Sequence, residues 1–218
     1  MSHVEMLFED RRDAGRRLAE RLAPYRDKRP VVFTLPRGGV PVGFEVSRAL
    51  NAPLDIIVAR KLGAPGQPEF GIGAVAPGGV RVLNERAVRA LGIPEDYLNW
   101  VSERETAEVA RRLQLFRGNR PYPDLETMTA ILVDDGLATG VTARAAVLAL
   151  RRLSPRRLVL AVPVCAQQTT ESLRPETDDL VCLLAPHNLE AVGLYYWDFE
   201  QVPDEEVIRL LEEARRVT

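Results

Sequence analysis

Apolar residues recur at helical spacing in several stretches of the chain. Ala14, Leu18 and Leu22 share one side of a highly charged segment over residues 11–23, which predicts an amphipathic helix. Similar spacing predicts a long helix over residues 94–117, with Pro94 at its start, and a terminal helix over 203–217. Shorter helical stretches are predicted to end at Leu50, to cover 141–153 and to lie near 169–174.

Short β-branched and apolar runs predict the strands. They cover residues 31–35, 54–60, 129–134, 157–164 and 179–184, and a further pair lies within 70–84 around the turn APGG. Strands and helices alternate in the second half of the chain, which is typical of right-handed crossovers that build a parallel sheet. The predicted fold class is therefore α/β, an open and mainly parallel sheet with helices on both faces.

Size and charge narrow the possible ligands. The chain has 218 residues with 46% hydrophobic content, which favours one domain over residues 1–218 that carries a small subdomain. The net charge of −2 offers no general basic field for nucleic acid, so we expect a small-molecule ligand. The charged N-terminus lacks the roughly 20 apolar residues that span a bilayer, so we expect no membrane partner and a cytoplasmic protein.

The stretch AILVDDGLATGVTARAA at residues 130–146 carries the clearest chemistry. Asp134 and Asp135 follow an apolar strand, and small or hydroxylic residues then lead into a helix that begins near Val141. Ligands of open parallel sheets bind beyond the carboxyl ends of the strands, and helix N-termini attract phosphate. The sequence therefore predicts a phosphate cradle beside two carboxylates that hold hydroxyls or a metal. The simpler interpretation is a helix cap and a solvated aspartate, but a cap needs only one carboxylate.

The segment ILVDDGLATGVT resembles the signature with which type I phosphoribosyltransferases bind phosphoribosyl pyrophosphate. The resemblance implies that Asp134 and Asp135 hold the ribose hydroxyls and assist catalysis. It also implies a 5-phosphate site, which would consist of Ala138, Thr139, Gly140, Val141 and Thr142. Members acting on 6-oxopurines carry an acidic residue where this chain has Ala138, so the loop looks closer to the adenine type, while the acceptor base stays open.

A second glycine-containing turn, TLPRGGVPVG at residues 34–43, follows a strand and opens a helix. In the resembling family a short turn at this place lies beside the pyrophosphate, often with a cis peptide, and this would assign Arg37, Gly38 and Gly39 to pyrophosphate binding. The glycines do not fit the dinucleotide pattern G-x-G-x-x-G, and the chain contains no P-loop sequence. A packing turn is the simpler alternative.

Arg60 and Lys61 end the strand predicted at 54–60 and precede the Gly/Pro-rich stretch at 62–69. The family closes a flexible loop over the reacting sugar at about this place, which implies that both cations assist catalysis by neutralising the leaving pyrophosphate. The alternative is an exposed hairpin with solvated charges.

The resemblance implies transfer of ribose 5-phosphate from phosphoribosyl pyrophosphate to a nitrogen nucleophile such as a nucleobase. Mg²⁺ is the expected cofactor, held through the substrate, with Asp134 and Asp135 as candidate ligands. A hood over the base is expected from the N-terminal helix and from residues 84–125 and 186–200. A regulatory protein that binds the same ligand without turnover is the first alternative, and an unrelated phosphate-binding hydrolase is the second. A homodimer is left open.

Overall fold

A parallel sheet lies at the centre of the structure, a computed structural model that describes residues 8–217. Its strand order is β2-β1-β6-β7-β8, and each neighbouring pair is parallel. The five strands are β2 (Leu54–Ile56), β1 (Pro30–Thr34), β6 (Thr129–Val133), β7 (Arg157–Val164) and β8 (Asp179–Leu184). The α/β fold class is thereby confirmed.

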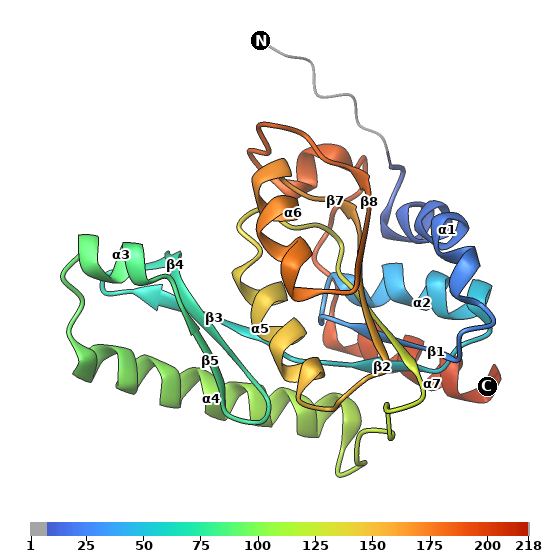
Figure 1. Cartoon of the computed structure of the whole chain (residues 1–218), viewed down its shortest axis with the longest axis horizontal. Helices are drawn as coiled ribbons and strands as arrows, with labels where there is room; N and C mark the ends of the chain where they lie inside the picture. The colour runs from blue at the N-terminus through green and yellow to red at the C-terminus, as the bar shows by residue number, and fades with distance from the viewer. Residues whose placement is uncertain (1–7, 218) are drawn as a thin grey trace.

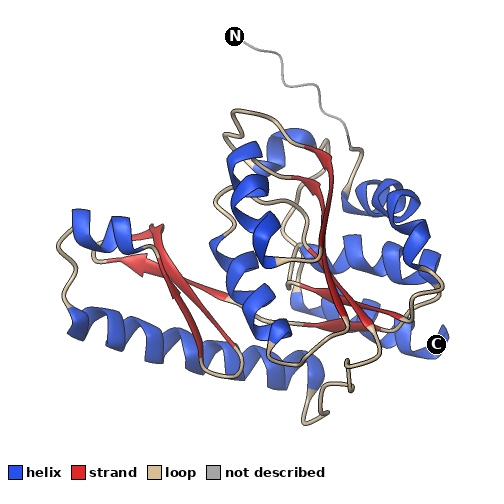
Figure 2. Ribbon diagram, in the orientation of Figure 1, coloured by secondary structure: helices blue, strands red, loops and turns tan. Residues whose placement is uncertain are grey.

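Helices cover both faces of this sheet (Figures 1 and 2). One face carries α1 (Arg11–Leu22), α2 (Gly39–Leu50) and α7 (Asp204–Val217), and the other carries α5 (Val141–Arg151) and α6 (Gln167–Leu173). Short 3-10 turns are η1 (Ala23–Tyr25), η2 (Arg174–Glu176) and η3 (Val192–Tyr195). No helix within residues 8–217 is long and apolar enough to cross a bilayer.

The central strands are apolar throughout because both of their faces are buried. In β6, Ile131 and Val133 join the core under α1, α2 and α7, while Ala130 and Leu132 join the core under α5. Successive side chains of a strand point to opposite faces, so one five-residue run supplies both cores. The two cores hold β6 in the middle of the sheet and so define where its carboxyl end lies.

A second, antiparallel sheet projects from the body as an arm, on the left in Figure 1. It has the order β3-β4-β5, from β3 (Arg60–Ala64), β4 (Gln67–Ala76) and β5 (Val80–Leu83), and it is followed by α3 (Glu85–Ala90). Helix α4 (Glu95–Arg117) runs from the arm back to the body. There Arg117 forms two hydrogen bonds with the Asp55 carboxylate, of 2.7 and 2.8 Å.

The strand predicted at 54–60 differs from the structure, and the two interpretations of the stretch 62–69 included the hairpin that is observed. The strand predicted at 54–60 ends at Ile56, because β1 offers no partner beyond the Thr34 pair, and the chain then enters the arm as β3 at Arg60. The Gly/Pro-rich stretch 62–69 is a hairpin, in which Gly66 adopts φ +70° at the turn between β3 and β4. Trp100 of α4 is 52% exposed.

The three segments expected to form a hood take different positions. Helix α1 packs on α2 in the main body, residues 84–125 form α3, α4 and the return to β6, and residues 186–200 contain η3. Phe8, just before α1, pairs with Tyr196 in an isolated bridge. Whether these segments enclose a base stays a prediction.

Candidate active site

The two loops singled out in the sequence lie against each other at the carboxyl edge of the sheet. They are neighbours because β1 and β6 are paired in register from Pro30 with Thr129 to Thr34 with Val133. The Leu35 N–H donates to the Val133 carbonyl at 3.1 Å, which continues the pairing beyond the strands. The turn after β1 and the acidic pair after β6 therefore leave the sheet side by side.

Glycine is required where these loops touch. A Cβ at Gly38 would overlap the Asp135 carboxylate, and one at Gly39 would lie 2.9 Å from the Val133 carbonyl and 3.0 Å from the Asp134 Cα. Cβ contacts this short do not fit without a shift, and the atoms facing Gly39 are mostly backbone. Gly38 and Gly39 thus allow the first loop to approach the acidic pair closely.

The first loop also has the peptide geometry that the family resemblance implied. The bond between Pro36 and Arg37 is cis. The Arg37 guanidinium reaches toward α7, where its Nη1 lies 3.5 Å from Asp204 Oδ1. Arg37 is thus at the expected edge of the sheet, but its charge is directed to a carboxylate of the protein.

Asp135 is held from two sides by residues that the sequence did not reveal as part of the site. Arg11 Nε donates to Asp135 Oδ2 at 2.8 Å, and the Tyr196 hydroxyl donates to the Asp135 carbonyl at 2.5 Å. The Arg11 guanidinium also stacks on the Phe199 ring, 3.8 Å from its centre. The Asp135 N–H in turn donates to Asp134 Oδ1 at 2.9 Å. The two carboxyls also contact each other directly, so Asp134 and Asp135 act as one linked pair.

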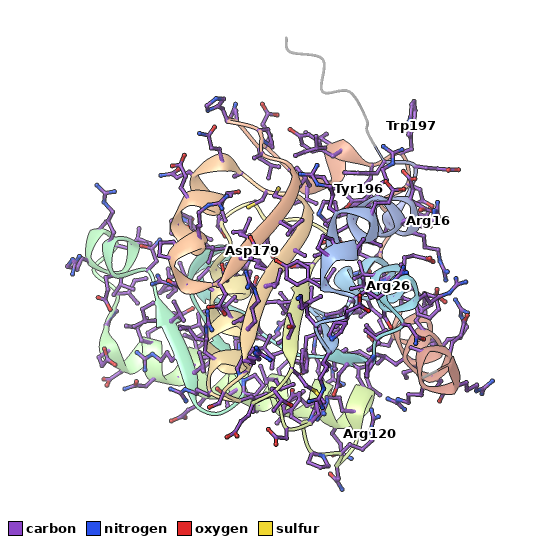
Figure 3. The ribbon with its side chains drawn as sticks, turned by 45° about the vertical axis from the view of Figure 1, so that its right-hand side comes forward. Arg16, Arg26, Arg120, Asp179, Tyr196 and Trp197 are labelled. Atoms are coloured by element: carbon purple, nitrogen blue, oxygen red, sulfur yellow. The ribbon has the colours of Figure 1, made fainter. Side chains whose placement is uncertain are left out.

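Arg11 and Tyr196 come from opposite ends of the chain. Figure 3 shows Tyr196 close to α1, while the neighbouring Trp197 points away from the fold. Tyr196 is 2% exposed and Trp197 is 73% exposed. A charged helix and an aromatic cluster were visible in the sequence, but nothing in their spacing linked either one to Asp135.

The pKa values of both Asp134 and Asp135 are raised in the folded protein. Removal from water is the main cause that raises the pKa of Asp134, and the neighbouring charge of Asp135 raises it further. Removal from water also raises the pKa of Asp135, although the Arg11 charge opposes that rise. The site thus carries a repulsion that a cation or a set of hydroxyl donors would relieve.

We expect Arg11→Met to destabilise the fold by about 2 kcal/mol at pH 7, because ionisation of the mostly buried Asp135 then lacks its cationic partner. A carboxyl whose pKa is raised in the folded state favours folding at low pH, and that contribution is lost as the pH rises through the folded pKa. Removing Arg11 raises this pKa further, so the penalty should be small near pH 4 and should grow toward pH 7. Urea unfolding of the variant and the wild type between pH 4 and pH 7 measures this difference in unfolding free energy. The control is Arg17→Met, which removes an exposed ion pair of the same helix, and its stability penalty should depend little on pH. A penalty for Arg11→Met that is equal at pH 4 and pH 7 would contradict the expectation.

The predicted 5-phosphate loop connects β6 to α5. Gly140 is the N-cap residue of α5, with φ +69° and no side chain that could cap the helix. The first amides of α5 therefore have no side-chain acceptor, which suits a bound anion. Ala138 and Thr139 are exposed, and the Thr169 hydroxyl donates to the Ala138 carbonyl at 2.5 Å, which holds the loop against α6.

Lys61 and Arg60 are separated by the alternation of β3. The Lys61 side chain lies beside Gly71. A Cβ added to Gly71 would lie 3.1 Å from the Lys61 Cδ and 3.8 Å from a Val141 methyl. Lys61 Nζ is bound within its own hairpin, to the Glu69 carbonyl at 2.9 Å and to its carboxylate at 3.0 Å. Arg60 points to α4 instead, where it pairs with the buried Glu105 at 2.9 Å. Both residues line a cavity against α4, and only the aliphatic part of Lys61 lies near Val141 at the start of α5.

A cavity of about 650 Å³ opens between the phosphate loop and the arm. Thr139, Gly140 and Val141 line one side of it, and Phe70 and Leu83 of the arm line another. Phe70 is 47% exposed, so it presents an aromatic surface next to the loop. Within residues 8–217, no three His, Cys, Asp or Glu side chains converge as a metal-binding group.

Comparison with known proteins agrees with this arrangement. The sequence profile of the phosphoribosyl transferase domain matches residues 3–199. Two curated Mycobacterium tuberculosis proteins, named "Putative phosphoribosyl transferase" MT0597 and Rv0571c, are each 45% identical over 210 residues. The match covers 96% of this chain and 47% of theirs, so the chain spans about half the length of these relatives.

The crystal structure of TT1426 from Thermus thermophilus superposes with a TM-score of 0.79 at 43% identity, covering 95% of this chain and 99% of that one. The chain therefore belongs to the type I phosphoribosyltransferase family.

Proposed function

We propose that the protein transfers ribose 5-phosphate from phosphoribosyl pyrophosphate to a nitrogen nucleophile such as a nucleobase, with release of pyrophosphate. The observation that carries this proposal is the contact of the Gly38–Gly39 turn with the Asp134–Asp135 pair. A pyrophosphate on the turn and a ribose on the carboxylates would be adjacent there, as they are in this substrate. The uncapped N-terminus of α5 would hold the 5-phosphate.

The chemistry needs opposite charges to be stabilised on the two sides of one bond. Breaking the bond from the sugar C1 to the pyrophosphate oxygen builds positive charge on the ribose and negative charge on the leaving group. The carboxylates of Asp134 and Asp135 would orient the ribose hydroxyls and stabilise the positive charge. Lys61, whose aliphatic part passes near Val141, would stabilise the leaving group after its ammonium is released from Glu69. Arg60 could take the same part only by leaving Glu105.

The acidic pair is also chemically suited to Mg²⁺, which prefers oxygen ligands and commonly binds through one or two carboxylates together with substrate phosphates. Asp135 is bound to Arg11, whereas no cation of the protein pairs with Asp134 within residues 8–217. Mg²⁺ held mainly by the substrate would supply charge neutralisation to the pyrophosphate. Because the pKa of Asp134 is raised, binding of the cation should release protons from the site.

The acceptor is proposed to enter by the cavity beside Phe70. An aromatic side chain can stack on a planar base, and the cavity volume of about 650 Å³ lies in the range of small-molecule sites. Ala138 leaves no acidic group at the position that implied 6-oxopurine specificity. Adenine is therefore the first base to test, followed by the oxopurines and pyrimidines.

Pyrophosphate release with a panel of bases tests the proposal directly. Turnover that requires both phosphoribosyl pyrophosphate and Mg²⁺ would support it. Binding of the sugar without release for any base would favour the regulatory alternative, and cleavage of simple phosphoesters without preference for this sugar would favour a hydrolase. Melting temperatures measured with and without the sugar separate binding from turnover.

Two anion sites should respond differently to substitution. Thr139→Val with Thr142→Val should weaken ribose 5-phosphate and the full substrate alike, by about tenfold, because both ligands would use the loop hydroxyls. Arg37→Ala should weaken mainly the pyrophosphorylated sugar. Calorimetric titration with both ligands measures the two patterns, and equal losses for both ligands in both variants would argue against separate sites.

Lys61→Ala should lower kcat about 100-fold while changing substrate affinity only a few fold, since its charge matters most as the leaving group gains charge. Lys61→Arg should rescue partly, because a planar guanidinium does not reproduce a compact ammonium. Glu69→Gln is the matched control: it weakens the hold on Lys61 Nζ and should not lower kcat. Equal turnover in all variants would reduce this hairpin to a structural element.

A further inference from the structure

A basic cavity of about 680 Å³ lies at the amino edge of the parallel sheet, where nothing in the proposed reaction takes place. The parallel strands begin around it: Arg29 precedes β1, Thr129 begins β6 and Arg157 begins β7. Asp134 lies at the other end of β6, about 16 Å along the strand from Thr129. The cavity is therefore separate from the candidate active site. It is lined by Tyr25, Asp27, Lys28, Arg29, Thr127, Thr129, Arg156, Arg157 and Asp178.

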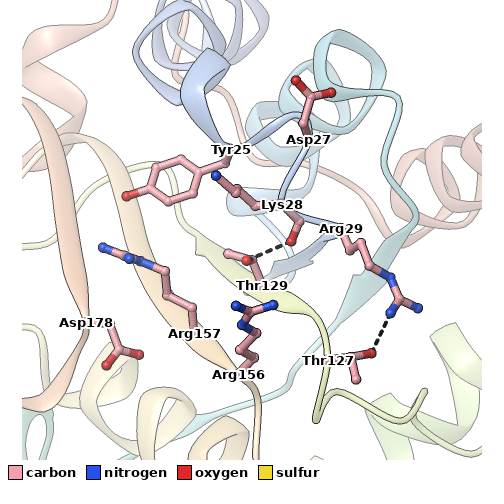
Figure 4. Close-up of a pocket in the computed structure, with 9 residues that line it drawn as sticks. All are labelled: Tyr25, Asp27, Lys28, Arg29, Thr127, Thr129, Arg156, Arg157 and Asp178. Atoms are coloured by element: carbon pink, nitrogen blue, oxygen red, sulfur yellow. Dashed lines mark hydrogen bonds between the residues drawn. The ribbon is translucent and has the colours of Figure 1, made fainter.

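Positive charge is concentrated here in a chain whose net charge is −2. Figure 4 shows Lys28, Arg156 and Arg157 turned toward the same space, while Asp27 points away. Asp178 is already engaged by Arg151 at 2.8 Å and by the Leu158 N–H at 2.7 Å. The carboxylates of the cavity thus do not balance its cations.

None of the four cations forms an ion pair with a carboxylate of residues 8–217. Arg29 donates to the Thr127 hydroxyl at 2.7 Å, and the Arg157 guanidinium lies over the Tyr25 ring, 5.8 Å from its centre. Lys28 and Arg156 form no ion pair with any residue in the described part of the chain, residues 8–217. Neighbouring unpaired cations repel each other, and a bound anion would remove that cost.

Hydrogen bonds of the backbone tie together the segments that carry these exposed cations. The Thr129 hydroxyl donates to the Lys28 carbonyl at 2.9 Å, and the Thr129 N–H donates to the Arg29 carbonyl at 3.1 Å. The Arg156 N–H donates to the Leu125 carbonyl at 3.0 Å. Segments that are far apart in the sequence are thus tied together, which lowers the entropy lost on binding an anion.

We propose that this cavity is a second ligand site, which binds a polyphosphate chain such as inorganic triphosphate or the triphosphate of a nucleotide. Three basic side chains that face one space, with Arg29 beside them, match an anion with three or more negative charges better than a single phosphate. Arginine suits phosphate oxygens because its guanidinium donates two parallel hydrogen bonds. The cavity volume of about 680 Å³ accommodates the phosphate chain with part of an organic group.

Isothermal titration with sodium triphosphate and with adenosine triphosphate tests this assignment. Lys28→Gln with Arg156→Gln should weaken both probes at least about tenfold, because two charge-assisted contacts are lost. The control, Arg86→Gln with Arg216→Gln, removes the same charge from exposed helix positions that do not line the cavity, and should change the affinity less than about twofold. Equal weakening in both double variants would overturn the proposal by showing nonspecific attraction.

The active site could also attract a polyphosphate, so the titration is repeated with phosphoribosyl pyrophosphate in saturating excess. Triphosphate binding that persists under this condition, with an unchanged affinity of the Lys28 and Arg156 variant for the sugar, supports a separate site. Complete competition by the sugar, or no heat from either probe at millimolar concentration, would overturn it.

If the sugar itself does not bind, the proposed function fails while the triphosphate titration still decides this inference. Stronger binding of the nucleotide than of triphosphate would support the proposal and show that the organic group adds contacts.

Discussion

Asp134→Asn with Asp135→Asn should abolish the stabilisation of the fold by phosphoribosyl pyrophosphate and Mg²⁺. At a ligand concentration of 100 times Kd, the wild-type protein should gain about 2.7 kcal/mol of stability. The double variant should gain almost none, because the groups proposed to hold the ribose hydroxyls lose their charge while they keep their shape. An unchanged ligand-induced rise in melting temperature would contradict the assignment of the ribose site.

The same double variant should be at least as stable as the wild type without ligand near pH 7. Removal from water raises the pKa of both carboxyls in the folded state. Their contribution to stability is therefore fully present below the unfolded pKa of about 3.9 and is lost as the pH rises through the folded values. Neutral amides remove that loss, although Arg11 then loses its charged partner, which limits the gain.

Urea unfolding from pH 4 to pH 8 measures this effect without any ligand. The difference in unfolding free energy between the variant and the wild type should move in favour of the variant as the pH rises. Asp96→Asn with Glu103→Gln removes the same charge from exposed positions of α4 and serves as the control. A variant that loses stability relative to the wild type as the pH rises would show that the carboxylates stabilise the fold in their charged form.

Gly39→Ala should both destabilise the fold, by about 1 to 3 kcal/mol, and eliminate substrate binding. The added methyl group would lie 2.9 Å from the Val133 carbonyl and 3.0 Å from the Asp134 Cα. These are backbone atoms at the end of a strand that is buried on both faces, so they cannot move aside without disturbing β6. The first loop would instead shift away from the acidic pair and separate the two proposed halves of the substrate site.

Thermal unfolding with and without phosphoribosyl pyrophosphate measures both consequences. Gly92→Ala is the control, since nothing lies within 4 Å of its Cβ position although its φ is +60°. It should cost some stability through backbone strain and leave the ligand response unchanged. A Gly39→Ala protein that keeps the full ligand response would show that close contact of the two loops is not needed for binding.

The alternation of strands and helices could be predicted from the sequence because hydrophobic periodicity reports which face of each element is buried. The α/β class, the long helix that became α4 and the acidic pair at the end of β6 all follow from patterns within about 20 neighbouring residues. Glycine turns were recognised as sites of close approach for the same local reason. The end of β2 was missed because a strand ends where its partner ends, and β1 supplies no partner beyond Thr34.

Only the tertiary structure decided which distant residues share a site. Arg11 is 124 positions from Asp135, and Tyr196 is 61 positions from it, yet both bind it. The adjacent residues Arg60 and Lys61 were assigned together from sequence, but Arg60 pairs with Glu105 of α4 and Lys61 binds Glu69 of its own hairpin. The basic cavity at the amino edge gathers side chains from turns that are far apart in the sequence, such as Lys28 and Arg156. Local periodicity determines each element, whereas the pairing order of the parallel strands determines which loops meet at each edge of the sheet.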